Sequence, residues 1–161
     1  SVREENLTEL KKALNEKCNL TEEDIIPVIK IDSPLLLEKV DEELISSIEK
    51  LRPFGKGNSS PLFAVKNLKV TRVFFMGKEK NFMKFIFLLR NSNLTIEGVN
   101  FDKYEGFKKE FIDTFGEERF LKLLDDGYAD FTMDIIYYPC INEYMGKRSI
   151  QLNIKNMRIS N

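Results

Sequence analysis

The sequence predicts an α+β fold in which a helix-strand-helix segment, residues 1–50, precedes a five-stranded β-barrel, residues 51–161. Apolar residues before residue 51 recur mainly at helical spacing, whereas most later segments alternate apolar and polar residues as strands do. The halves meet at residues 51–63, which contain two prolines, two glycines and an asparagine, residue types that interrupt regular structure. The domain boundary is therefore expected at residue 51.

The first half is predicted to form a helix, a strand and a second helix. Residues 4–17 carry an apolar stripe at helical spacing. Residues 25–31 are rich in β-branched side chains and contain a proline, which predicts a strand at the edge of a sheet. Asp41 is a good N-cap for the second helix. The apolar face of that helix carries Leu44, Ile45, Ile48 and Leu51. Two helices and one strand cannot close a sheet, so residues 1–50 either end a larger domain or pack against the second half.

The second half begins with three predicted strands, over residues 62–75, 84–90 and 94–101. A compact turn at residues 91–93 joins the second strand to the third. The alternation of apolar residues changes phase at Gly98, which predicts a β-bulge that would let the third strand curve.

A helix and a hairpin complete the predicted barrel. Residues 104–126 have apolar residues at helical spacing, with a break expected at Gly116. Two strands follow, over residues 131–137 and 150–154, and residues 139–147 are expected to connect them. Three strands, a helix and a final hairpin are the order of an OB-fold, the small five-stranded barrel that recurs among oligonucleotide-binding modules.

Charge is unevenly distributed along the chain. Residues 1–50 carry 7 Lys and Arg against 13 Asp and Glu, a net charge of −6, whereas residues 51–103 carry 10 against 3, a net charge of +7. Several cations of the second segment fall on the first two strands of the barrel and the loop between them. They are Arg72, Lys78, Lys80, Lys84 and Arg90. On an OB-fold, such cations contact phosphates while aromatic side chains stack on bases. Lys and Arg on a strand also serve simply to solvate it and protect its edge.

Several absences limit the chemistry that this chain can perform. It has no histidine, which excludes Ser-His-Asp and Cys-His catalysis and histidine-ligated metal sites within these residues. Cys18 and Cys140 are far apart and form no CxxC motif, so both are expected to be small buried apolar side chains. No segment approaches the roughly 18–20 apolar residues of a membrane-spanning helix, and no secretion signal is recognisable. The expected location is cytoplasmic.

Four segments carry a resemblance to a known family. Leu51–Phe63 is similar to the L-x-P-F-G-x-G-N-x-x-P-x-F stretch of RecJ-type single-stranded-DNA-specific exonucleases, where it links the DHHA1 domain to the OB domain. Ile141–Leu152 and Ile154–Arg158 are similar to the family's I-N-E-W-N-G-x-x-S-x-Q-L and K-D-I-R patterns. Ile25–Asp32 resembles its strand before the linking helix. The matches span nearly the whole chain in the family's order.

The resemblance implies a division of labour. The family's nuclease chemistry uses Asp and His ligands for Mn²⁺ or Mg²⁺ in a DHH domain, together with a His-containing motif early in DHHA1. A chain without histidine contains neither. Residues 1–50 would then be the end of a DHHA1-like domain with its linking helix, and residues 51–161 the OB domain. Such a fragment would have no catalytic residue, metal ion or cofactor and no nuclease activity alone. It would hold single-stranded DNA for the catalytic part of a 5′–3′ exonuclease of DNA recombination and repair.

The candidate nucleic-acid-binding residues are six cations, one aromatic residue and one amide. They are Arg72, Lys80, Lys84, Arg90, Tyr144, Lys147, Arg148 and Gln151. Tyr144 stands near a predicted hairpin tip, where the family usually has tryptophan, and is the best candidate for stacking. The cations would neutralise phosphates, and Gln151 would bond to sugars or bases. Where the family often has His-Leu-Lys, this chain has Asn81–Lys84.

The linker residues have a structural interpretation. They are Pro53, Phe54, Gly55, Gly57 and Asn58. The two glycines are expected to allow positive φ, because no strand-loop-helix follows them as a phosphate-binding loop requires.

Two other functions remain open from the sequence. The acidic N-terminal segment and the helix at residues 107–124 fit a protein-docking module of a repair complex. An RNA-binding OB module is equally compatible with phosphate contacts and stacking. The expected partners are therefore single-stranded DNA and other DNA-repair proteins, with no membrane.

Overall fold

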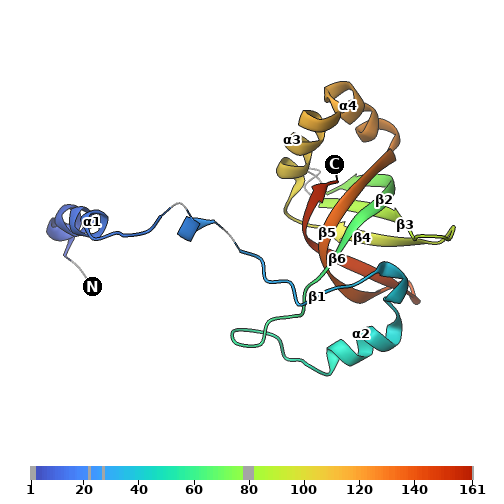
Figure 1. The fold of residues 1–161 in the computed structure, drawn as a ribbon, viewed down its shortest axis with the longest axis horizontal. Coiled ribbons are helices and arrows are strands. Elements are labelled where there is room, and N and C mark those ends of the chain that lie inside the picture. The colour runs from blue at the N-terminus through green and yellow to red at the C-terminus, as the bar shows by residue number, and fades with distance from the viewer. Residues whose placement is uncertain (1–2, 22, 27, 78–81, 161) are drawn as a thin grey trace. The chain divides into compact units, whose positions relative to one another are not determined.

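The computed structural model describes residues 3–21, 23–26, 28–77 and 82–160 (Figure 1). The chain divides into two compact units, Ser1–Lys30 and Ile31–Asn161. The first contains the α-helix α1 (Leu7–Glu16), which confirms the predicted N-terminal helix, and two short 3₁₀ helices, η1 (Glu4–Asn6) and η2 (Glu23–Ile25). No described helix has the length and apolar character needed to cross a membrane.

The strand predicted over residues 25–31 is wrong. This segment begins at the end of η2, and its described residues from 28 onwards pair with no strand that the structure describes. Their side chains are exposed, with Val28 at 88%. β-Branched residues favour strands only where a neighbouring strand packs against them. The strand of this region is instead the two-residue β1 (Ser33–Pro34), parallel to the start of β2. Cys18 is exposed rather than buried, and Cys140 is half-buried.

Five long strands form a sheet that closes on itself. They are β2 (Phe63–Met76), β3 (Phe82–Leu88), β4 (Thr95–Asn100), β5 (Tyr128–Tyr144) and β6 (Lys147–Ile159). The order β1-β2-β3-β4-β6-β5 is completed by pairing of β5 with β2. Among these five strands the pairs are antiparallel, except for β4 with β6, which are parallel. The predicted OB-fold is confirmed.

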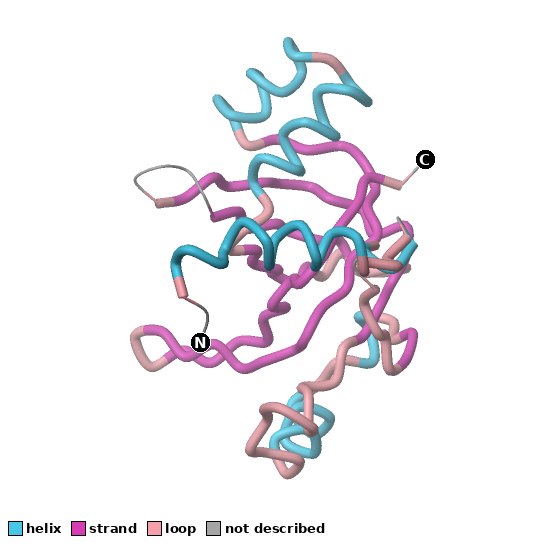
Figure 2. The backbone as a smooth tube through the Cα atoms, turned by 90° about the vertical axis from the view of Figure 1, so that its left-hand side faces the viewer, coloured by secondary structure: helices cyan, strands magenta, loops and turns pink. Residues whose placement is uncertain are grey.

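Two helices lie together at one end of the barrel (Figure 2). The predicted helix is divided into α3 (Tyr104–Phe115) and α4 (Glu117–Asp126) by Gly116, as expected, and Gly116 has a φ of 89°. Phe107 and Phe111 of α3 are buried among the aromatic residues of the core. The two helices therefore supply part of the core as well as the connection from β4 to β5.

A helix and the linker after it pack against β5. The helix α2 (Glu42–Glu49) begins at Asp41, whose side chain accepts a hydrogen bond of 2.8 Å from the Leu44 N–H, as the N-cap prediction requires. Ile45 and Ile48 are buried, but Leu51, expected on the same face, is exposed. The Tyr138 hydroxyl on β5 donates to the Glu49 carboxylate at 2.9 Å.

Residues 53–58 form a tight loop. Gly55 and Asn58 exchange backbone hydrogen bonds of 2.8 and 3.1 Å, and the Asn58 amide donates to the carbonyls of Leu51 and Pro53. Gly57 has a φ of 88°, as predicted, whereas Gly55 is outside the positive-φ region. Phe54 meets the Tyr138 ring edge-on at 6.1 Å. The linker is therefore attached to the barrel by a hydrogen-bonded turn and an aromatic contact.

The bulge predicted at Gly98 is wrong. The β3–β4 register runs without a shift from Met83↔Asn100 to Leu88↔Thr95. A Cβ at Gly98 would lie 2.7 Å from the Phe87 ring and 2.8 Å from the Ile154 side chain. Glycine is required because two core side chains approach the backbone. The apolar pattern changes phase because Val99 and Asn100 are both buried although they point to opposite faces.

Gly98→Ala is expected to destabilise the barrel by about 1–3 kcal/mol, because the new methyl group overpacks the core. Urea denaturation followed by circular dichroism would measure this free energy of unfolding. Gly106→Ala on α3 is the control, since a Cβ there meets no atom within 4 Å. A Gly98→Ala protein as stable as the natural chain would contradict the role assigned to this glycine.

Two other predicted boundaries are corrected by the structure. Residues 139–144 belong to β5 rather than to a connecting arm, because they pair along their whole length with β6. The turn contains only Met145 and Gly146, with φ values of 49° and 74°. At the other hairpin, β3 ends at Leu88, so Arg90 lies in the turn before β4.

Candidate nucleic-acid interface

The side chains of β3 alternate between the core and the outside of the barrel. Met83, Phe85 and Phe87 are fully buried, so Lys84 and Ile86 point outward. Strand pairing extends this outward row over the neighbouring strands, because directly opposed residues share a face. We call the outward side of β2, β3, β4 and β6 the outer face.

Two rows of paired residues cross the outer face. In one row Phe74 pairs with Lys84, Lys84 with Val99, and Val99 with Asn153. In the other row Arg72 pairs with Ile86, Ile86 with Glu97, and Glu97 with Gln151. The structure thus brings three of the predicted binding residues, Arg72, Lys84 and Gln151, onto one face.

Exposed aromatic residues that sequence reasoning did not select lie on and beside this face. Phe74 is 39% exposed and lies 5.7 Å from the Lys84 ammonium. Tyr128, 60% exposed, is opposite Arg72 on β5. Phe101, 55% exposed, contacts the ring of Phe82 at 5.9 Å. Phe74 was detectable, because it stands two positions after Arg72 on a predicted strand and two-residue spacing keeps side chains on one face.

The cations of the outer face differ in their partners. Lys84 forms an ion pair with Glu97 at 3.2 Å, and Lys69 pairs with Asp130. The Lys69 hydrogen bond and charge lower the pKa of Asp130, so this carboxylate is ionised at neutral pH. Within the described residues Arg72 forms no ion pair. Arg72 is therefore the cation of this face that is most available to bind a phosphate of a nucleic acid.

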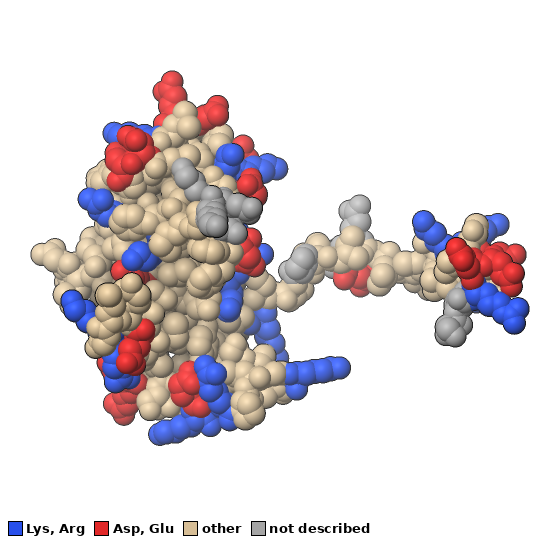
Figure 3. Space-filling model, turned by 180° about the vertical axis from the view of Figure 1, so that it is seen from behind, with Lys and Arg blue, Asp and Glu red and all other residues tan. Residues whose placement is uncertain are grey.

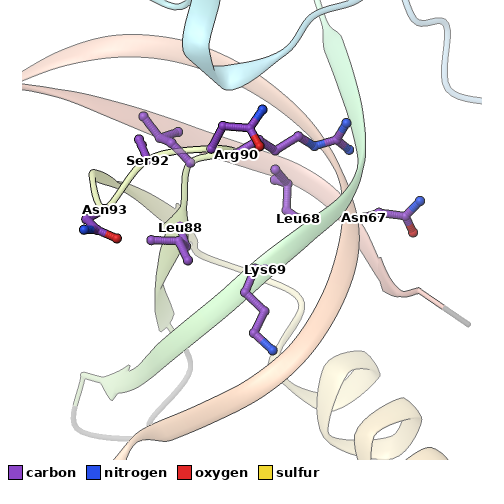
Figure 4. A pocket seen from close by; sticks show the side chains of 9 residues that line it. Asn67, Leu68, Lys69, Leu88, Arg90, Ser92 and Asn93 are labelled. Carbon is purple, nitrogen blue, oxygen red and sulfur yellow. The ribbon is translucent and has the colours of Figure 1, made fainter.

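A shallow depression of about 480 Å³ lies at one end of the outer face (Figure 4). Lys69 lines it from β2, and Arg90 with residues 91–93 lines it from the turn after β3. Arg90 reaches toward β2, where its guanidinium donates to the Lys66 carbonyl at 2.8 Å, and its backbone N–H donates to the Glu38 carboxylate at 2.6 Å. Arg90 is thus at the rim of the outer face and already has a structural role.

The tip of the β5–β6 hairpin lies at this same end. β4 and β6 run parallel, and Glu97 is opposite Gln151. Counting the same number of residues back along each strand brings Lys147 level with Asn93, which belongs to the turn that lines the depression. Tyr144 and Lys147 are paired at the tip, and Tyr144 is 69% exposed. Arg148 is 3.5 Å from the Glu42 carboxylate of α2. Three further predicted residues therefore adjoin the outer face, one of them with its charge partly neutralised.

Lys80, like Lys78, falls outside the described residues. On the side of the barrel shown in Figure 3, Lys and Arg are interspersed with Asp and Glu rather than gathered into one basic patch. Among the residues that the structure describes, no group of three or more Cys, Asp or Glu side chains is arranged to hold a metal ion.

Comparison with known proteins agrees with the fold of this region. The family model of the RecJ OB domain matches residues 31–156. The chain belongs to this family. The single-stranded-DNA-specific exonuclease RecJ of Bacillus subtilis is 28% identical over 163 residues, a match that covers 99% of this chain. The chain spans only 18% of that relative's length. It therefore corresponds to a RecJ-type C-terminal OB region, as the sequence motifs indicated.

Solved structures give weaker likenesses to this RecJ OB region. A Leishmania major protein assigned as an aspartyl-tRNA synthetase has a TM-score of 0.42 at 10% identity, covering 94% of this chain and 26% of that one. The mitochondrial single-stranded DNA binding protein Rim1 of Saccharomyces cerevisiae has a TM-score of 0.34 at 7% identity, covering 67% of this chain and 96% of that one. Neither likeness is close enough to carry an argument.

Proposed function

We propose that this RecJ OB region binds single-stranded DNA for a 5′–3′ exonuclease of DNA recombination and repair in the cytoplasm. Its membership of the RecJ OB domain family and its similarity to a single-stranded-DNA-specific exonuclease support the proposal. The nuclease chemistry, with its Mn²⁺ or Mg²⁺, would belong to DHH and DHHA1 domains elsewhere on the parent polypeptide. Residues 1–30, which precede the segment matched by the OB-domain family, would be the end of that DHHA1 domain, and the fragment alone would have no nuclease activity.

The observation that carries the proposal is the mixture of aromatic and cationic side chains on the outer face. Phe74, two positions after Arg72 on β2, and Tyr128, opposite Arg72 on β5, are both exposed, and Lys84 is beside Phe74. Aromatic rings stack on the bases of a single strand, contributing about 1–3 kcal/mol per base, while cations neutralise its phosphates. In a duplex the bases are already stacked on one another, so this face favours single strands.

Fluorescence anisotropy of a labelled single strand of about 20 nucleotides, titrated at two salt concentrations, tests the proposal. Affinity should fall with salt, and an unlabelled blunt duplex should compete poorly. If about four cations contact phosphates, the slope of log K against log salt should be roughly −3. Equal competition by the duplex, or no binding at low salt, would contradict the proposal. Equal affinity for RNA of the same sequence would favour the RNA-binding alternative instead.

One observation keeps protein docking as a second candidate. The apolar side chains of α1 are exposed, because no residue of this helix is buried within the unit that contains it. They are Leu7, Leu10 and Leu14. By contrast, the apolar residues of α3 and α4 are largely taken up by the barrel core. Absence of DNA binding in the titration would favour this docking function.

A further inference from the structure

A carboxylate lies in the middle of the outer face. Glu97 is on β4, which has β3 on one side and β6 on the other, so its neighbours in the row are Ile86 and Gln151. Its side chain is half-exposed. A face that served only to collect phosphates would gain nothing from a negative charge there, because a carboxylate repels a phosphate. The position of Glu97 requires another explanation.

The partners of Glu97 leave part of it available. Lys84 donates to Oε1 at 3.2 Å and offsets the charge. Across the described residues, no hydrogen bond uses Oε2, and none uses the side-chain amide of Gln151. Neighbouring strands are about 4.8 Å apart, so the two groups lie close enough for one planar base edge to meet both. The outer face thus presents an acceptor beside a group that both donates and accepts.

The geometry points to Glu97 and Gln151 as a pair that reads the edge of an unstacked base and selects bases with an exocyclic amino group over thymine. The inference rests on the proposed function. In cytosine and adenine the amino group donates to Glu97, and the adjacent ring nitrogen accepts from the Gln151 amide. Guanine offers two donors to the carboxylate. Thymine offers only one donor, its N3–H, which lies between two carbonyl oxygens, so a carboxylate that accepts from it is also repelled by a neighbouring oxygen.

Surrounding residues fix where the base would lie. Arg72 is two strands from Glu97 in the same row, and Tyr128 is beyond it. A phosphate held at Arg72 and a base stacked on an exposed ring leave the middle of the face for a base edge rather than for the backbone. Lys84 lies between Phe74 and Glu97, where it keeps the carboxylate from repelling the strand as a whole.

Titration with oligo-dC and oligo-dT of about 20 nucleotides tests this selection, since both are pyrimidine strands that differ in their base edges. The natural chain should bind oligo-dC about five- to tenfold more tightly at neutral pH. Glu97→Gln should reduce this ratio to about twofold or less, because an amide can donate to the thymine carbonyl. The ratio of two affinities on one protein is insensitive to a loss of folded material.

Glu143→Gln is the matched control, because Glu143 is exposed on β5 near the hairpin tip and its loss removes the same charge. This variant should leave the affinity for each strand unchanged or raise both affinities by the same modest factor, and so keep the preference for oligo-dC. Binding of oligo-dT as tight as that of oligo-dC, or a ratio unchanged by Glu97→Gln, would overturn the inference while leaving the proposed function standing. Failure to bind either strand at low salt would overturn both.

Discussion

Arg72→Glu is expected to weaken binding of a single strand at least about tenfold at low salt, a loss of about 1.4 kcal/mol. Arg72 is exposed on β2, between Tyr128 on β5 and Ile86 on β3. The substitution removes a phosphate contact and puts a second carboxylate near Glu97. Anisotropy titrations at several salt concentrations would measure the affinity. The magnitude of the salt slope should also fall by about one.

Lys109→Glu is the matched control for Arg72→Glu. Lys109 is exposed on α3, away from the strands that form the outer face, and the charge change is the same. Its affinity should stay within about twofold of the natural value. Arg72→Lys, which keeps the charge, should retain most of the binding. If the two charge reversals weakened binding equally, the effect would come from the net charge of the protein. The proposal that the outer face binds the single strand would then be contradicted.

Phe111→Ala is expected to lower the free energy of unfolding by about 3–5 kcal/mol, the largest stability effect of any change considered. Phe111 is 1% exposed, and its ring centroid lies 5.3 Å from that of Phe131 on β5, 5.6 Å from that of Phe107 and 5.8 Å from that of Phe120 on α4. Truncation leaves a cavity where α3, α4 and the barrel meet. A domain of this size has a stability of about 5–15 kcal/mol, so much of it would be lost.

Urea denaturation followed by circular dichroism would measure the effect of Phe111→Ala. Phe111→Leu should cost much less, because leucine refills most of the volume. Phe101→Ala is a second comparison, since that phenylalanine is exposed and its loss should change stability little. A cost below about 1 kcal/mol for Phe111→Ala would mean that the helices are not part of the barrel core.

Features of the fold that depend only on residues close together in the sequence could be predicted. The split between α3 and α4 at Gly116 and the capping of α2 by Asp41 follow from local chemistry, and both are present. The segment over residues 25–31 shows the limit of this reasoning. It has strong strand propensity, but propensity forms a strand only with a partner, and the pairing begins later, at Ser33.

The candidate site was predictable only in part, because the pairing of the strands decides which side chains share a face. Arg72, Lys84 and Gln151 could be selected as polar residues on strands, but the exposure of Tyr128 and Phe101 could not. A register shift between Val70 and Arg72 decides which β2 side chains face outward, and only the paired strands reveal it. The ion pair between Lys84 and Glu97 likewise joins two strands whose alignment no local pattern determines.

The parallel pairing of β4 with β6 has a consequence for how the protein reaches its native state. Glu97–Val99 and Gln151–Asn153 lie more than fifty positions apart along the chain, and they are the pairs that close the barrel between these strands. Contacts of such large sequence separation carry a high loop-closure entropy and form slowly. Pulsed hydrogen exchange during refolding should therefore find the β2–β3–β4 meander protected before the β4–β6 seam. The pair formed by Glu97 and Gln151 would then be among the last parts of the molecule to assemble.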